Sequence, residues 1–501
     1  MKALLMYRDR DFNLEQELPH HALALIQDLE LDTLVRAMSG DDQMVFNVAR
    51  KALLSGLQND EDTIHHRQMI AKDCLKNPAV VRQLYTLAEE GFEGKKNHHF
   101  GFFTRYPGGI LSDSIALLRT FIDVLRRLRG LAEEHTGRFE SEGFTALFSM
   151  LKKEFTDDYF VGVENHLAEL EFRDSVLLSA RLGEGNESID FALRLRHDKR
   201  PNCFKRIFRR RGWPFTVRIH ERDEAGSRAL AELRNRGIDL VANALAQSAD
   251  HILNFFDMLR TELAFYIGCL NLHDKLVSMG APTSFPQPMA AGTREHHCRG
   301  LYDVCLALMM GRSVVGNDLH ADGKNLIIIT GANQGGKSCF LRGVGLAQLM
   351  MQCGMFIAAE SFSAELCAGL FTHFKREEDA TMKSGKLDEE LGRMSDIVDF
   401  LAPNSMLFFN ESFAATNERE GSEIARQIVR ALLEQHIKVF FVTHLYEFAH
   451  GFFDREMEEA LFLRAERTAD GTRTFKLVEG EPMQTSYGED LYYEIFEADS
   501  P

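Results

Sequence analysis

Residues 326–338 read LIIITGANQGGKS, an apolar run followed by a loop of small residues and a Lys-Ser pair. The run from Leu326 to Ile329 predicts a short buried strand, and the residues after Lys337 predict a helix. From Gly331 to Ser338 the chain fits the pattern G-x-x-x-x-G-K-[ST] at every fixed position. Because this pattern lies between a predicted strand and a predicted helix, we interpret it as a phosphate-binding P-loop.

The P-loop pattern gives each residue type an expected task. Small residues let backbone N–H groups curl around phosphates, and the helix N-terminus adds positive potential. We expect Lys337 to reach the β- and γ-phosphates of ATP and Ser338 to bind Mg²⁺. Cys339 is one of eight scattered cysteines and is expected to be buried. The residues predicted to contact the nucleotide are Gly331, Ala332, Asn333, Gln334, Gly335, Gly336, Lys337, Ser338 and Cys339.

Two further strand ends supply polar residues of the kind that a P-loop enzyme needs. The stretch SMLFFNES (405–412) predicts a strand that ends at Asn410 and Glu411. We expect Glu411 to orient or deprotonate the attacking water and Asn410 to lie in the Mg²⁺ shell, where an Asp is usual. The stretch KVFFVTH (438–444) places His444 at a strand's carboxyl end, where open α/β sheets bind ligands. Lys337, Glu411 and His444 are therefore the predicted catalytic residues, with His444 sensing the γ-phosphate.

The charge balance limits how the chain can bind nucleic acid. With 58 Lys and Arg against 75 Asp and Glu, the formal net charge is −17, so a basic contact must be a local patch. Such a patch lies between Arg194 and Arg222, where eleven basic and two acidic residues are interleaved with aromatic ones. We predict phosphate binding and base stacking there, and a solvated surface is the alternative. The candidate residues are Arg206, Arg209, Arg210, Arg211 and Trp213.

The predicted elements indicate a multidomain protein: an α-helical core with long lever helices, and a carboxyl-terminal α/β P-loop ATPase domain. A proline-free run from about Arg228 to Val277 predicts one long helix. Another long helix is expected from Asp113 or Ser114 as N-cap. The predicted divisions are a helical core (1–112), a first lever helix region (113–172), a β and basic tip (173–226), a second lever helix (227–289) and the ATPase domain (290–501). Without a signal peptide or a long apolar run, a cytoplasmic protein with no membrane contact is expected.

Beyond the P-loop, several short motifs resemble those of the MutS family of ABC-type ATPases. The P-loop TGANQGGKS, the stretch NESFAATNEREG and the TH pair match that family's Walker motifs, D-loop and switch. Further matches are VGND (315–318), Glu360-Ser361 and SYG (486–488). The resemblance implies a helical core, paired lever arms and a homodimer with composite ATP sites. It also implies that Asn317 lies beside the adenine.

The departures from the family pattern bear on function. Mismatch-reading members carry additional N-terminal domains, including one with a Phe-x-Glu wedge, whereas this chain starts at the helical core. Mismatch reading by that route is therefore not expected. The family's serine that reaches the partner's γ-phosphate has Ser384 as its nearest counterpart, in a loose alignment.

We therefore expect a dimeric, ATP- and Mg²⁺-dependent clamp that binds DNA by structure rather than by sequence and acts in mismatch repair, other DNA repair or recombination. Two alternatives stay open. One is an RNA- or ribosome-associated ATPase. The other is a nucleotide switch with negligible hydrolysis, which the neutral Asn410 suggests.

Overall fold

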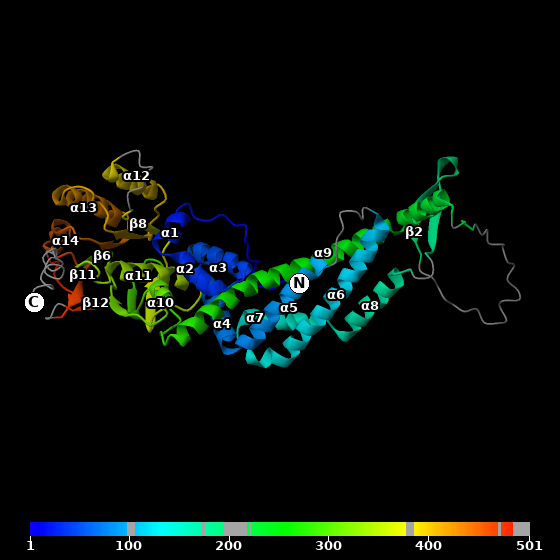
Figure 1. Ribbon diagram of the computed structural model, residues 1–501, viewed down its shortest axis with the longest axis horizontal. Coiled ribbons are helices and arrows are strands. Elements are labelled where there is room, and N and C mark those ends of the chain that lie inside the picture. The colour runs from blue at the N-terminus through cyan, green and yellow to red at the C-terminus, as the bar shows by residue number, and fades with distance from the viewer. Residues whose placement is uncertain are drawn as a thin grey trace, which may run out of the picture. The chain divides into compact units, whose positions relative to one another are not determined.

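The computed structural model describes residues 1–97, 106–172, 176–194, 218–220, 222–376, 385–468 and 472–483. Its backbone forms two compact units (Figure 1). Unit 1 contains residues 1–2, 83–136 and 146–260, and unit 2 contains residues 3–82, 137–145 and 261–501. The boundaries of these two units differ from those of the five domains expected from the sequence, and the division into five domains stays a prediction. No described helix is long and apolar enough to cross a membrane.

Unit 1 is mostly helical. Phe256 packs against Gly91, where an added Cβ would lie 2.5 Å from the Phe256 ring, and it contacts Phe121 at a centroid distance of 5.4 Å. The chain therefore needs a glycine where two helices approach this closely. The elements wholly or largely in unit 1 are α5 (Pro78–Asn97), α6 (Pro107–His135), α7 (Glu142–Glu154), α8 (Asp157–Leu170), β1 (Leu178–Leu182), β2 (Ser188–Leu193) and the first part of α9 (Glu224–Ser278).

The predicted start of the helix near residue 113 is wrong. Helix α6 begins at Pro107 with Tyr106 as its N-cap, because proline is well suited to the first helical position. Ser114 is fully buried inside the helix, where it cannot act as a cap. The segment 113–172 contains most of α6 together with α7 and α8.

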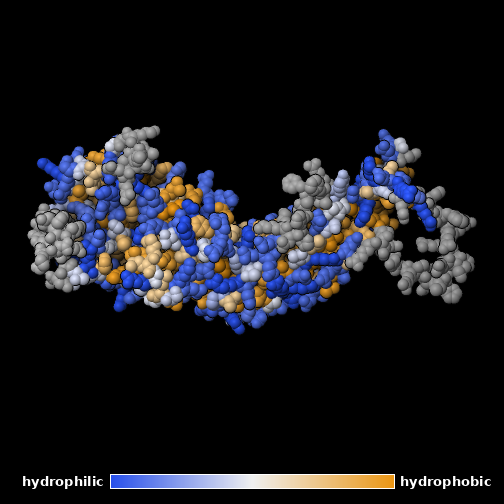
Figure 2. Space-filling model, in the orientation of Figure 1, coloured by the Kyte–Doolittle hydropathy of each residue, from blue (hydrophilic) through white to orange (hydrophobic). Residues whose placement is uncertain are grey.

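The long proline-free run forms a single helix, α9, as the sequence predicts. Its amino-terminal part lies beside the antiparallel hairpin of β1 and β2, since an added Cβ on Gly237 would meet the Leu178 side chain at 2.3 Å. Figure 2 shows apolar surface in this part of unit 1, where Leu230, Leu233 and Leu240 are exposed. A lever function for this helix stays a prediction.

Unit 2 contains a helical part at the start of the chain. Its elements are α1 (Ala22–Asp28), α2 (Leu31–Ser39), α3 (Gln43–Ser55), α4 (Glu61–Lys76) and the end of α9. The buried Glu262 on α9 accepts hydrogen bonds from the backbone N–H groups of Leu5, Met6 and Phe12 at 2.6, 3.3 and 3.1 Å. One carboxylate thus fixes the amino-terminal segment to this helix.

The rest of unit 2 is an α/β structure built on two sheets. The larger sheet has the strand order β12-β11-β6-β10-β9-β8, and all its neighbours are parallel except β11 and β12. The smaller sheet has the order β3-β7-β4-β5. The strands are β3 (Gln287–Met289), β4 (His296–Leu301), β5 (Asn317–His320), β6 (Leu326–Thr330), β7 (Ser361–Glu365), β8 (Leu370–Phe374), β9 (Met406–Asn410), β10 (Lys438–Val442), β11 (Ala460–Arg467) and β12 (Arg473–Glu479).

Helices cover the larger sheet, which explains why its central strands are apolar throughout. All five residues of β6 are buried, as are all five of β10. Ile328, Phe409 and Phe441 share one core cluster with residues of α13 and α14. Helix α11 contacts β9 and β10. The helices of this part are α10 (Val304–Met310), α11 (Lys337–Gln352), α12 (Lys386–Val398), α13 (Glu418–Glu434) and α14 (Tyr446–Phe453).

Candidate nucleotide site

The predicted P-loop follows the strand β6 and leads into the helix α11, as the sequence indicates, and close packing requires glycine at two of its positions. Gly331 has φ +118°, and an added Cβ would lie 2.8 Å from the backbone nitrogen of Ala465 on β11. A Cβ on Gly335 would approach the Ala465 side chain to 2.7 Å. Gly336 caps α11 with φ 89°. A larger residue at Gly331 or Gly335 would push the loop away from the sheet, whereas one at Gly336 would have to adopt a left-handed backbone conformation.

Lys337 is the first residue of α11 and is only 4% exposed. Its ammonium group donates hydrogen bonds to the carbonyl oxygens of Gly331 and Ala332, both at 2.8 Å. Burial lowers the pKa of Lys337 to about 8, while the charge of Glu411 opposes this shift. The lysine is thus held inside the loop by acceptors that a phosphate can replace.

Ser338, near the start of α11, lies next to Asn410 at the carboxyl end of β9. The Ser338 hydroxyl donates a hydrogen bond of 2.9 Å to the Asn410 side-chain oxygen. Asn410 is the last residue of β9, and Ser338 is exposed in the first turn of α11. A hydroxyl and an amide oxygen are hard ligands of the kind that Mg²⁺ accepts, so the pair fits a metal that is also held by phosphate oxygens. It provides no negative charge of its own.

Glu411 and His444 meet at the carboxyl ends of β9 and β10. The Glu411 carboxylate lies 3.1 Å from Nε2 of His444 and 4.0 Å from the ammonium group of Lys375. The hydrogen bond with His444 holds the pKa of Glu411 below its ordinary value, against the effect of burial, and the charges of His444, Lys375 and Lys337 add to this shift. Glu411 therefore carries a negative charge at neutral pH.

A pocket of about 720 Å³ opens next to these residues. Asn333, Gln334, Gly335, Gly336, Lys337, Ser338, Cys339, Asn317 and Glu411 line it together with an apolar wall that includes Leu306, Met310, Val315 and Phe475. Cys339 is partly exposed at this pocket, so the expectation that it is buried is wrong. The phosphate-binding pattern cannot reveal the apolar wall, because its residues come from α10, the segment between α10 and β5, and β12.

Asn317 lines the pocket, but both ends of its amide are bound to β12. Its nitrogen donates to the Phe475 carbonyl at 3.2 Å, and its oxygen accepts from the Leu477 N–H at 2.7 Å. We expect this residue to hold Phe475 at the pocket wall. Gln334 is likewise anchored, because Arg473 donates a hydrogen bond of 2.7 Å to its side chain.

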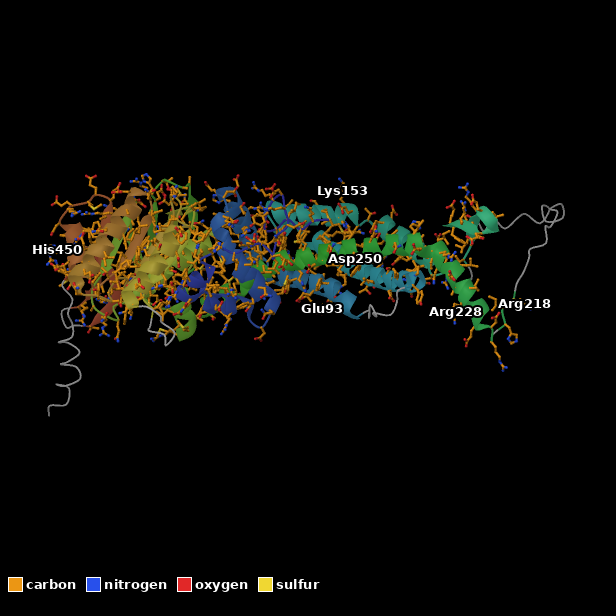
Figure 3. All side chains as sticks on the ribbon, turned by 90° about the horizontal axis from the view of Figure 1, so that it is seen from above. Glu93, Lys153, Arg218, Arg228, Asp250 and His450 are labelled. Carbon is orange, nitrogen blue, oxygen red and sulfur yellow. The ribbon has the colours of Figure 1, made fainter. Side chains whose placement is uncertain are left out.

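Several predicted residues lie outside the described part of the chain. These are Ser384, Arg206, Arg209, Arg210, Arg211 and Trp213, together with the SYG motif. Of the basic stretch, the structure describes Arg194, residues 218–220 and Arg222. Ile219 lies next to the start of α9, since an added Cβ on Gly226 would be 3.0 Å from its side chain. Figure 3 places Arg218 and Arg228 toward the same end of unit 1.

Comparison with known proteins identifies the family. Residues 59–279 match the family model for the MutS2 N-terminal domain, and residues 327–492 match the model for MutS domain V. The chain is 26% identical over 226 residues to the DNA mismatch repair protein MutS of Lactobacillus acidophilus. This match covers 42% of this chain and 26% of that protein.

Two further relatives match shorter stretches. The chain is 32% identical over 138 residues to the DNA mismatch repair protein MutS of Porphyromonas gingivalis, covering 26% of this chain and 16% of that protein. It is 28% identical over 152 residues to the MutS protein homolog 4 of Mus musculus, covering 30% and 16%. The matched segments thus span about a quarter or less of each relative. With both family models matched in order along it, the chain belongs to the MutS family.

Proposed function

We propose that the chain is a MutS-type ATPase that binds ATP with Mg²⁺ and hydrolyses it. The observation that carries this proposal is the convergence of Lys337, Ser338, Asn410, Glu411 and His444 at one edge of the larger sheet, beside a pocket with an apolar wall. The apolar wall suits a nucleobase and the P-loop suits its phosphates.

Each residue of the site has a separate task in this proposal. Lys337 exchanges its two loop carbonyl acceptors for phosphate oxygens, which carry charge and accept stronger hydrogen bonds. Ser338 and Asn410 would hold Mg²⁺, and the ion would supply positive charge that offsets the charge of the phosphates. Because its pKa is lowered, Glu411 is a weak base, so it acts mainly by orienting the attacking water. His444 fixes the carboxylate through the hydrogen bond at 3.1 Å.

The proposal extends to the ligand and to the assembly. We infer that two copies pair when ATP is bound and that nucleotide state controls the grip on DNA. Two relatives are named as DNA mismatch repair proteins, and the basic stretch lies between the β1–β2 hairpin and α9 in the sequence. Phosphate contacts by that stretch would give binding that depends on the structure of the nucleic acid and on salt rather than on sequence.

A salt series on one set of substrates tests the nucleic-acid proposal. Duplex, mismatched, branched and single-stranded DNA and RNA are compared with the wild type and with a variant in which Arg206, Arg209, Arg210 and Arg211 are changed to Glu. We expect the variant to bind all DNA more weakly and with a flatter salt dependence, since each duplex phosphate contact adds about 0.9 to the log–log slope. Equal binding by both proteins would exclude this stretch as the contact. Tighter binding to RNA, together with co-sedimentation with ribosomes, would favour an RNA-associated ATPase.

One observation also favours a switch with slow hydrolysis. The pair of Ser338 and Asn410 offers Mg²⁺ no carboxylate. If Mg²⁺ is held weakly, the protein would still bind ATP but would hydrolyse it slowly. A turnover rate that stays near zero at saturating Mg²⁺, with ATP bound, would identify this second function.

A further inference from the structure

A lysine outside the P-loop lies beside the proposed catalytic carboxylate. Lys375 directly follows β8, and its backbone N–H donates a hydrogen bond of 2.9 Å to the carbonyl of Asn410. This bond continues the β8–β9 ladder and places Lys375 at the sheet edge that carries the nucleotide site. Its ammonium group lies 4.0 Å from the Glu411 carboxylate, which lines the pocket.

The position of Lys375 leaves its side chain free to respond to a ligand. The distance of 4.0 Å is the outer limit of an ion pair, and the Lys375 side chain is 43% exposed. Pairs of this kind contribute little to stability. A lysine ammonium on its flexible stem can therefore turn from the carboxylate to a phosphate oxygen at small cost.

The charges of the site indicate how movement of the Lys375 side chain to a phosphate would affect ATP binding. Lys337 and Lys375 supply two positive charges, Glu411 supplies one negative charge, and Ser338 and Asn410 are neutral. A site with an acidic residue at position 410 would depend on Mg²⁺ to offset that residue and the phosphates. Because Asn410 is neutral, this site is more positive than a site with an acidic residue at position 410. Lysine can therefore offset part of the phosphate charge that a metal would otherwise offset.

We propose that Lys375 is a second phosphate-binding cation of the nucleotide site, and that it makes ATP binding less dependent on Mg²⁺. This inference rests on the proposed function, because it requires that ATP occupies the pocket. It concerns binding rather than catalysis, and so it can be tested without any measurement of turnover.

The test is equilibrium binding of ATP and ADP in Mg²⁺ and in EDTA. We expect Lys375→Met to weaken ATP binding about tenfold in EDTA and only about two- to threefold in Mg²⁺, as the loss of one charge-assisted contact implies. The loss should be smaller for ADP, and Lys375→Arg should restore most of the affinity. Lys324→Met is the matched control, because Lys324 precedes β6 at the opposite edge of the sheet and bonds to the Glu458 carbonyl.

Different failures have different meanings. Unchanged ATP affinity of Lys375→Met in EDTA would overturn the inference, and so would an equal loss in both buffers. If binding is unchanged but turnover falls, Lys375 only positions Glu411, and the inference is wrong. If the wild type binds no ATP, or if Lys337→Ala binds it equally well, the proposed function itself fails.

Discussion

The Glu411→Gln substitution separates ATP binding from ATP hydrolysis at this site. The change removes one negative charge and keeps the size of the side chain, and an amide can still bond to His444 across the 3.1 Å contact. The geometry should therefore persist, while the oxygen that orients the water loses its charge. Removal of one preorganised contact to the reacting groups typically costs about 10² to 10³ in rate, so we expect turnover to fall by about 10³, or about 4 kcal/mol of barrier.

The same substitution should not weaken ATP binding. Removal of a carboxylate from the phosphate side of the pocket lowers repulsion, so the affinity should stay equal or rise. Phosphate release and equilibrium binding, measured on the same preparations, provide the two readouts. Glu140→Gln is a matched control, since Glu140 pairs with Lys76 at 3.1 Å on the surface. Hydrolysis by Glu411→Gln at the wild-type rate would refute the assigned role.

The remaining predictions concern metal, assembly and stability. Asn410→Asp should lower the Mg²⁺ concentration needed for half-maximal ATPase, because it adds a charge beside Ser338, and an unchanged titration would place Asn410 outside the metal shell. Glu411→Gln should elute as a dimer with ATP and as a monomer without it, whereas a monomer in both cases at micromolar concentration would contradict a composite site. Burial raises the pKa of Glu262 to about 7. Between about pH 4.5 and 7 the folded state therefore keeps a proton on Glu262 that the unfolded state has lost. This stabilisation of the wild type disappears as pH rises through that window. The free energy of unfolding lost in Glu262→Ala, measured by denaturation, should therefore become smaller as pH rises. A loss that does not change with pH would mean that Glu262 stays ionised.

The strands, the loop and the helix start that carry the proposed phosphate-binding residues could be predicted from the sequence because these features are local. Each of β6, β9 and β10 is a short apolar run that ends in polar residues, and parallel strands bring their carboxyl ends to one edge. The GKS pattern fixes the loop and the start of α11 within a few residues. These signals do not depend on distant parts of the chain.

The rest of the site depends on tertiary pairing that no local pattern contains. Phe475 reaches the pocket because β12 pairs with β11 and because Asn317 holds its carbonyl. Lys375 lies near Glu411 only because β8 pairs with β9. The start of α6 was misplaced because Ser114 looks like a cap in sequence, although the apolar face of the helix already includes Leu111.

Equilibrium binding of ATP in the presence of Mg²⁺ to the wild type and to Lys337→Ala tests the central claim most directly. Lys337 is the buried cation of the P-loop, and its loss removes the charge that the phosphates need. We predict that the wild type binds one ATP per chain and that Lys337→Ala, with its fold verified by circular dichroism, binds at least about a hundredfold more weakly. A wild type that binds no ATP, or a variant that binds it with equal affinity, would contradict the account.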